Sequence, residues 1–202
     1  MIRRFHDEKY EEDFALVALL KDCSKKKNLC QGQKLHVDIL KKGLLRKSPY
    51  LSSSLISMYG NCGVLEKARE VLDELPIRNV VSWNALISGH AQQGQVHEAL
   101  NCLRQMRKEG IFPNAITFIC ILKACINIES LSKGEEIHEE VVFNGLLEKD
   151  VALGTTIVDM YVKCGALARA REVLEQLPIR NTITWNTLIS GYAQNGQGHE
   201  AI

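Results

Sequence analysis

The sequence has almost no net charge, few aromatic residues and no long apolar run. Its 25 lysines and arginines are balanced by 24 aspartates and glutamates, so the chain lacks the bulk basic excess that first indicates a nucleic-acid-binding protein. Any such site must come from the local placement of side chains. No stretch approaches the roughly 18 to 20 consecutive apolar residues that a membrane span requires, and we expect no membrane partner. Hydrophobic residues still make up 46% of the chain, which is ample to bury a core.

The sequence also lacks the short motifs that carry most enzyme chemistry. It has no glycine-rich phosphate loop, no G-x-S-x-G and no H-E-x-x-H, so catalysis has no visible site. The absence of a C-x-x-C pair argues against a zinc site. We therefore expect no catalytic residue, no metal, no cofactor and no small-molecule substrate, and we predict that the chain is not an enzyme.

A long internal repeat is the strongest feature that is present. The segment Pro76–Leu100 returns as Pro178–Ile202 at an offset of 102 residues, and 17 of the 25 aligned positions are identical. Other residues obey the same offset, for example His36 with His138. A fixed long period is typical of a stacked repeat array, in which each unit packs only on its neighbours.

Each period contains three helical hairpins of unequal length. In each, an apolar helix is followed by a turn, a second helix and a glycine or proline break. The turn at Asn61-Cys62-Gly63 supplies glycine where a left-handed residue is needed, and Pro76 ends the helix that follows. The predicted hairpins span residues 13–48, 49–79, 80–114, 115–150 and 151–181, with a cut-off sixth at 182–202. Residues 1–12 and the incomplete sixth hairpin are interpreted as fragment ends.

Apolar spacing predicts the buried faces of the first hairpin. The first helix is expected to end near Cys23 and the second at Gly43. The residues that predict the two faces are Phe14, Val17, Ala18 and Leu20 on the first helix, and Leu35, Ile39 and Leu40 on the second.

Cysteines and histidines follow the repeat, which favours structural roles for them. Cys23 and Cys125, and Cys62 and Cys164, are one period apart, and there are seven cysteines in all. We expect packing positions with reduced thiols. The run His138-Glu139-Glu140 spells the H-x-E of zinc deaminases, but the P-C-x-x-C that completes their signature is missing. A half-buried structural histidine is the favoured interpretation.

The triplet of 35-, 36- and 31-residue hairpins resembles the PLS subclass of plant organellar pentatricopeptide repeat (PPR) proteins. The order of motif types is L, S, P, L, S, P, and the resemblance covers residues 13–202. It is carried by the P-type segments VVSWNALISG at Val80–Gly89 and GIFPN at Gly110–Asn114, the L-type ILKAC…GEEIH…NG at Ile121–Gly145, and the S-type IVDMYVKCGAL…AREVLEQLPIRN at Ile157–Asn181. The resemblance implies an all-α, right-handed superhelical solenoid of helix-turn-helix PPR hairpins.

The resemblance also implies which side chains meet RNA. In PPR proteins each hairpin reads one base with two or three side chains, namely its fifth and last residues, and its second residue packs on the base plane. The base-reading residues implied here are Ser53, Asn79, Asn84, Asn114, Thr155, Asn181 and Asn186. The base-packing residues are Tyr50, Val81, Ala152 and Ile183.

The L-type hairpins depart from this reading pattern. Their fifth residues, Val17 and Ile119, cannot hydrogen-bond a base, and Ser48 and Asp150 stand at their last positions. We expect these hairpins to act mainly as spacers. The implied RNA sequence is x-A-Y-x-A-Y, where x is unspecified and Y is a pyrimidine.

Two alternatives stay open at this point. Asn79, Asn114, Asp150 and Asn181 each precede a predicted helix, so they can act as helix caps, alone or while also reading bases. Trp83 and Trp185 stand beside candidate base-reading residues and could stack on bases, but their helical spacing with leucine and isoleucine favours a core position.

The function implied by the resemblance is sequence-specific binding of single-stranded RNA in a plant mitochondrion or chloroplast. The chain would serve as a specificity factor for C-to-U editing or another RNA-processing step, with editing-factor proteins as further candidate partners. The alternative is a protein-binding scaffold of the tetratricopeptide kind, which has similar hairpins but a uniform period of 34 residues.

Overall fold

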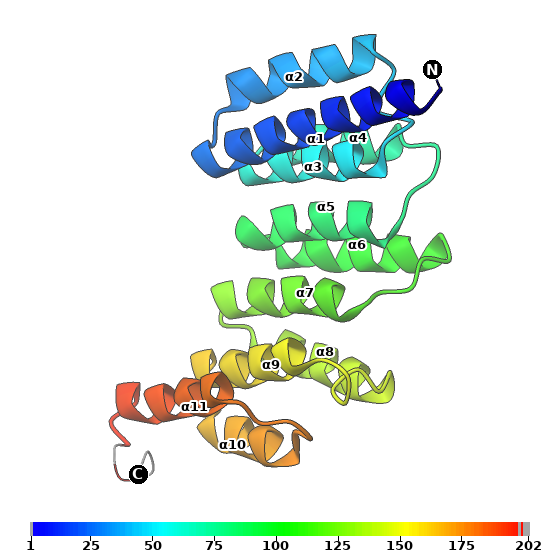
Figure 1. The fold of residues 1–202 in the computed structure, drawn as a ribbon. Coiled ribbons are helices and arrows are strands. Elements are labelled where there is room, and N and C mark those ends of the chain that lie inside the picture. The colour runs from blue at the N-terminus through cyan, green and yellow to red at the C-terminus, as the bar shows by residue number, and fades with distance from the viewer. Residues whose placement is uncertain (1, 198, 200–202) are drawn as a thin grey trace. The chain divides into compact units, whose positions relative to one another are not determined.

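The computed structural model describes the backbone of residues 2–197 and 199 and the side chains of residues 13–197 and 199. This part of the chain contains eleven α-helices and no strand (Figure 1), which confirms the all-α prediction. The helices are α1 (Ile2–Lys26), α2 (Leu29–Lys41), α3 (Pro49–Asn61), α4 (Leu65–Asp73), α5 (Val80–Gln92), α6 (Val96–Lys108), α7 (Ala115–Asn127), α8 (Leu131–Phe143), α9 (Val151–Lys163), α10 (Leu167–Gln176) and α11 (Thr182–Gln194). None of the helices described is long and apolar enough to cross a membrane.

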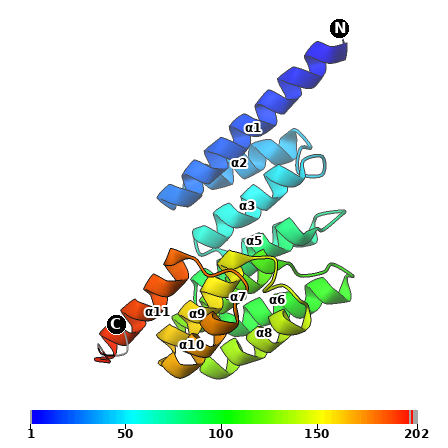
Figure 2. The same ribbon diagram turned by 60° about the horizontal axis from the view of Figure 1, so that its bottom comes forward.

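The chain forms two compact units, and the first comprises residues 1–93. It holds the hairpins α1/α2 and α3/α4, followed by α5. Helix α3 lies between α1 and α5 and packs against both (Figure 2). Leu20, Leu55 and Ile87, one from each of these three helices, are completely buried. The first helices of successive hairpins therefore stack side by side, as a repeat solenoid requires.

The second unit, residues 94–202, is built in the same way. It begins with α6 and continues through the hairpins α7/α8 and α9/α10 to α11. Helix α9 packs against both α7 and α11, and α6 packs against α7. Phe118, Ile157 and Leu174 are completely buried in its core. The predicted solenoid of helical hairpins is confirmed in both units.

Backbone chemistry explains where α3 and α4 end. Gly63 adopts the left-handed conformation with φ of 78°, and the next N–H, of Val64, donates to the carbonyl of Tyr59 at 3.0 Å. This αL ending confirms the predicted turn. Helix α4 stops at Asp73, just before Leu75-Pro76. Its last carbonyls accept hydrogen bonds from the guanidinium of Arg78, at 3.1 Å to Leu72 and 3.1 Å to Asp73.

The first helix differs from its prediction in length and in the face that it buries. It begins at Ile2 and ends at Lys26, because residues 2–12 contain no glycine or proline that would stop it. Its buried side chains are Leu16, Leu20 and Cys23, whereas Phe14 is 71% exposed. Ala18 is exposed as well. The prediction is therefore confirmed for Leu20 and wrong for Phe14 and Ala18. On α2 the predicted core residues Leu35 and Ile39 are buried, whereas Leu40 is exposed at 46%.

Candidate nucleic-acid interface

The first turn of α5 is closed by a reciprocal pair of hydrogen bonds. Asn79 Oδ1 accepts the backbone N–H of Val81 at 3.0 Å and that of Ser82 at 2.9 Å. In return, Ser82 Oγ accepts the N–H of Asn79 at 3.1 Å. This is a capping box with serine at the third helical position. The predicted helix-capping role of Asn79 is confirmed.

Capping repeats at the other predicted positions. Asn114 Oδ1 accepts the N–H of Thr117 at 3.1 Å, and Asn181 Oδ1 accepts the N–H of Thr184 at 2.8 Å. Asp150 Oδ1 accepts the N–H of Leu153 at 2.9 Å. Caps of this kind typically stabilise a helix by about 1 kcal/mol. The last residue of each of these hairpins thus fixes the start of the next first helix.

The buried hydroxyl that stands three residues after each capping asparagine was not predicted from the sequence. Ser82 is 2% exposed, and Thr117 and Thr184 are completely buried. Their signal is the spacing N-x-x-S/T, which occurs at Asn79, Asn114 and Asn181. A short hydroxyl side chain three residues after a capping asparagine suits this role because it reaches back to the cap.

The second S-type hairpin brings its fifth and last side chains together. Thr155 Oγ1 lies 2.8 Å from Thr184 Oγ1, and Thr184 Oγ1 donates to Asn181 Oδ1 at 2.8 Å. Thr155 Oγ1 is also 2.9 Å from the carbonyl oxygen of Val151. Two candidate base-reading residues, Thr155 and Asn181, are therefore joined through one capping hydroxyl.

The remaining fifth residues lie at different depths. Ser53 on α3 is 9% exposed, and its hydroxyl donates to the carbonyl of Tyr50 at 3.1 Å. Asn84 on α5 is 7% exposed. Thr155 is half-buried and Asn186 on α11 is exposed. The fifth residues of the first unit, Ser53 and Asn84, are therefore less exposed than those of the second unit, Thr155 and Asn186.

The candidate base-packing side chains are exposed in all four cases. Tyr50 is 77% exposed, Ile183 67% and Val81 55%, and Ala152 is exposed too. Each stands at the second position of a first helix. Isolated exposed apolar residues are ordinary, but here they recur at one position of successive first helices. In both units they offer apolar surface at the starts of first helices.

The two tryptophans differ in environment. Trp83 is 1% exposed, and the guanidinium of Arg69 lies 5.5 Å from the centre of its ring. Its predicted core position is confirmed. Trp185 is 43% exposed, so the same prediction is wrong for the chain as described.

The two repeat-related histidines make matching contacts with tyrosines. His36 Nδ1 lies 2.9 Å from the hydroxyl of Tyr59, and His138 Nδ1 lies 3.0 Å from that of Tyr161. His138 is 9% exposed. Its structural role is confirmed by this contact. Among the described residues, no group of three or more histidine, cysteine or acidic side chains is placed to hold a metal ion.

The cysteines are free thiols. Cys23, Cys102 and Cys125 are buried, and burial raises the pKa of the Cys125 thiol to about 11. A thiol in this environment stays protonated at neutral pH and is a poor nucleophile. The packing role predicted for Cys23 and Cys125 is confirmed, because both are buried.

We predict from His36 and His138 that the stability of the folded chain falls in mild acid. Burial lowers the pKa of both imidazoles from the ordinary 6.5, against the raising effect of Glu74 and Glu70 at His36 and of Glu139 at His138. The unfolded chain therefore binds protons at a higher pH than the folded one. Stability is fully present above about pH 6.5 and is lost as pH falls from there through the folded pKa values.

Melting temperatures at pH 7.5 and 5.5 would measure this dependence. The double variant His36→Gln/His138→Gln should lose less stability on acidification than the wild type, whereas His97→Gln, at an exposed site, should behave like the wild type. Equal acid sensitivity of the double variant and the wild type would contradict the assignment.

Known proteins are similar to this chain in sequence and in fold. A family model described as the PPR repeat family matches residues 78–127, and one described as the PPR repeat matches residues 51–80 and 183–202. A chloroplastic pentatricopeptide repeat-containing protein of Arabidopsis thaliana is 35% identical over 190 residues, which are 94% of this chain and 30% of that protein. A putative mitochondrial one from the same plant is 40% identical over 185 residues, 92% of this chain and 29% of that protein. The chain thus spans about a third of the length of these relatives.

Solved structures show the same architecture. The PPR protein PPR10 in complex with an 18-nt psaJ RNA element superposes with a TM-score of 0.71 at 20% sequence identity, over 92% of this chain and 28% of that one. PPR10 is a maize protein. The helical hairpins, the matches to the repeat models and the relatives agree, and the chain belongs to the pentatricopeptide repeat family.

Proposed function

We propose that this chain binds single-stranded RNA and reads one base per P-type or S-type hairpin. The observation that carries the proposal is the cluster of Thr155, Thr184 and Asn181, in which the fifth and last side chains of one hairpin meet. The polar side chains of the fifth and last residues of this hairpin lie in one cluster, and the second residue of the same hairpin, Ala152, is exposed. This arrangement suits a flat ligand with a hydrogen-bonding edge, such as a nucleobase.

Capping leaves hydrogen-bond donors for such a base. Asn181 Oδ1 accepts from both the N–H and the hydroxyl of Thr184, and Asn79 Oδ1 accepts two N–H groups of α5. An asparagine amide also has two N–H donors. In the part of the chain that the structure describes, the amide nitrogens of Asn79 and Asn181 make no hydrogen bond, so each can donate to a base. Capping and base reading are compatible at these positions.

The exposed second residues supply the other half of a base site. Tyr50, Val81 and Ile183 are each more than half exposed, and contact with a base would cover them. Stacking of one base on an aromatic side chain is worth about 1 to 3 kcal/mol, which makes Tyr50 the strongest packing candidate. The L-type hairpins add little to reading, because Val17 and Ile119 are half-buried apolar residues.

The wider role rests on the pattern of hairpin lengths and on the relatives. The 31-, 35- and 36-residue alternation leads us to assign the chain to the PLS subclass with the target x-A-Y-x-A-Y. Relatives named chloroplastic and mitochondrial lead us to place it in one of these organelles. We assign to it target recognition for C-to-U editing or another RNA-processing step, with the reaction carried out elsewhere and editing-factor proteins as further partners.

Binding to a matched and a permuted RNA at one stated salt concentration tests the proposal. The x-A-Y-x-A-Y sequence should bind at least about tenfold more tightly than the permuted one, which corresponds to about 1.4 kcal/mol. Equal affinity for the two RNAs, together with tight binding of a peptide, would favour the tetratricopeptide-like scaffold instead.

A reciprocal exchange of fifth residues tests the reading itself. Asn84→Thr should shift the preference at one base from pyrimidine toward purine, and Thr155→Asn should shift another from adenine toward pyrimidine. The change expected at each base is about 1 to 3 kcal/mol, with the helical content unaltered by circular dichroism. Unchanged preferences in both variants would argue against reading by the fifth residue.

A further inference from the structure

The two L-type hairpins have the same fold but opposite charge. Residues 13–48 contain nine lysines and arginines and three aspartates. Residues 115–150, one period later, contain three lysines and seven acidic residues. Helical hairpins do not require such a difference, because the exposed face of a helix accepts either sign. The excess of positive charge therefore needs a reason other than folding.

Much of the excess lies at the last residue of α2 and in the connection that follows it to α3, residues 41–48, which we call the α2–α3 edge. Its cations are Lys41, Lys42, Arg46 and Lys47, and all four are exposed. The repeat equivalents in the connection from α8 to α9 are Phe143, Asn144, Glu148 and Lys149. Four positive charges in one connection thus stand against a net charge of zero in the other.

The backbone of the two connections is the same. Gly43 and Gly145 both have φ of 63°. The N–H that follows each glycine donates back to its helix, from Leu44 to the Ile39 carbonyl at 3.1 Å and from Leu146 to the Val141 carbonyl at 3.2 Å. Because the scaffold is unchanged, the cations are not needed to form the turn.

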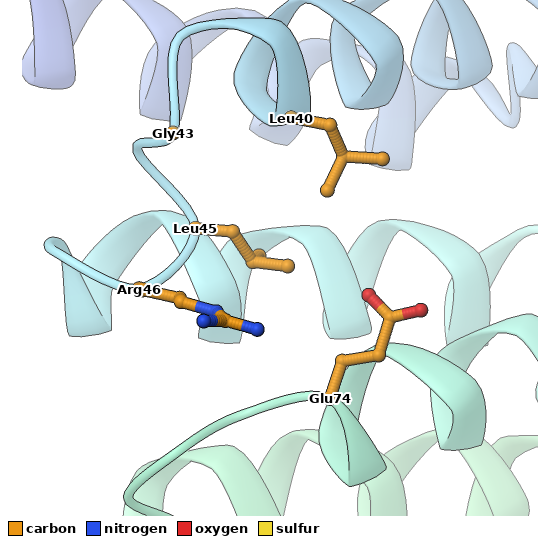
Figure 3. A pocket seen from close by; sticks show the side chains of 5 residues that line it. All are labelled: Leu40, Gly43, Leu45, Arg46 and Glu74. Carbon is orange, nitrogen blue, oxygen red and sulfur yellow. The ribbon is translucent and has the colours of Figure 1, made fainter.

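Most of the cations of the α2–α3 edge are not held in ion pairs within the described residues. Arg46 lines a pocket of about 210 Å³ together with Leu40, Leu45 and Glu74 (Figure 3). Glu74 supplies a carboxylate to that pocket, which Arg46 faces. In the part of the chain described by the structure, Lys41, Arg46 and Lys47 make no ion pair. Their field therefore acts on whatever approaches this edge.

The α2–α3 edge directly adjoins a candidate base-packing residue. Lys47 precedes Ser48 and the start of α3, where Tyr50 is 77% exposed. Cations that follow the backbone, next to an aromatic ring that a base can stack on, are the combination that single-stranded nucleic acids bind. The equivalent of Tyr50 in the second unit is Ala152, so ring and charge are absent there together.

We infer that the α2–α3 edge binds the phosphates of single-stranded RNA without regard to sequence, beside the unread base of the first L-type hairpin. The inference rests on the proposed RNA binding and adds to it an electrostatic contribution from one hairpin. Reading residues then supply specificity, and this edge supplies affinity that depends on salt.

The test compares salt dependence among variants of the full chain. For single strands the slope of log K against log salt is about −0.7 per phosphate contact. Lys41→Gln/Arg46→Gln/Lys47→Gln should therefore make the slope shallower by roughly 2, so that the loss of affinity between 50 and 200 mM salt shrinks on the order of 20-fold. The preference for x-A-Y-x-A-Y over the permuted RNA should stay unchanged, because bases are read elsewhere.

A matched control removes the same charge from the same hairpin. Lys21, Lys25 and Lys34 are exposed and lie toward the α1–α2 turn, away from the α2–α3 edge. Replacing these three by glutamine should leave the slope close to that of the wild type. An equal loss of slope in both triple variants would show a diffuse field and would overturn the assignment of the α2–α3 edge.

A gain-of-function variant tests whether cations at the equivalent place in the second unit are enough to bind phosphates. Phe143 is 90% exposed, and Phe143→Lys/Glu148→Arg places two cations on the second connection. It should steepen the slope by roughly 1.4.

The outcomes separate this inference from the proposed function. If the wild type binds RNA and the triple variant of the α2–α3 edge has the same slope, the inference fails and RNA binding stands. If the wild type binds neither the matched nor the permuted RNA, the proposed function and this inference both fail. In that case, an acidic peptide that binds the wild type but not the edge variant would identify the α2–α3 edge as a protein-binding surface.

Discussion

Trp83→Ala is expected to lower the free energy of unfolding by about 3 to 5 kcal/mol, whereas Trp185→Ala should cost much less. Replacing a buried tryptophan removes its transfer free energy and leaves a cavity. Trp83 is 1% exposed and Trp185 is 43% exposed, so the same substitution at two repeat-equivalent positions compares burial directly. Trp83→Ala also removes the contact of the Arg69 guanidinium, 5.5 Å from the ring centre, which adds on the order of 0.5 to 2 kcal/mol.

Denaturant titration of both variants, followed by circular dichroism, measures the difference. Repeat arrays can unfold in parts, so midpoints should be compared only where two probes give coincident transitions. An additional variant, Arg69→Ala, separates the cation contact from the cavity. A Trp83→Ala chain that unfolds at the wild-type midpoint would show that Trp83 does not hold the first unit together, and equal costs for the two tryptophans would show that burial is not the cause.

The hairpins, their turns and their caps could be predicted from the sequence because each depends on residues close together in the chain. The turn at Gly63 needs a left-handed residue, and the caps at Asn79 and Asn181 act on N–H groups two or three positions away. The N-x-x-S/T spacing would have revealed Ser82 and Thr184 in the same way. Local chemistry of this kind is visible in a single sequence.

Burial was harder to predict because it depends on neighbours that are distant in the chain. The predicted face of α1 included Phe14 and Ala18, which are exposed, and omitted Leu16, which is buried, since in a run rich in alanine, valine and leucine the helical period has no clear phase. Trp185 shares the local sequence of Trp83, but its exposure depends on what packs against it. Likewise, the depths of Ser53 and Asn84 follow from the packing of α3 against its neighbours.

Gly89→Leu is expected to lower the free energy of unfolding by about 1 to 3 kcal/mol, through crowding of α3 against α5. A Cβ atom on Gly89 would lie 3.0 Å from the Cα of Gly60 and 3.0 Å from Cδ2 of Leu65. The first of these neighbours is backbone, so relief requires the two helices to separate. Glycine within a helix itself costs roughly 0.5 to 1 kcal/mol relative to alanine, and a larger residue would recover this amount, but overpacking typically costs 1 to 3 kcal/mol. Crowding should therefore dominate for leucine.

Gln92→Leu on the same helix is the matched control, because Gln92 is exposed. Its effect should stay within about 0.5 kcal/mol. The Gly89 variant also connects packing to reading, since α3 and α5 carry Ser53 and Asn84. If base reading depends on the distance between these helices, a folded Gly89→Leu chain should lose part of its preference for x-A-Y-x-A-Y over the permuted RNA, while Gln92→Leu keeps it. A Gly89→Leu chain as stable as Gln92→Leu would mean that α3 and α5 do not need their close approach.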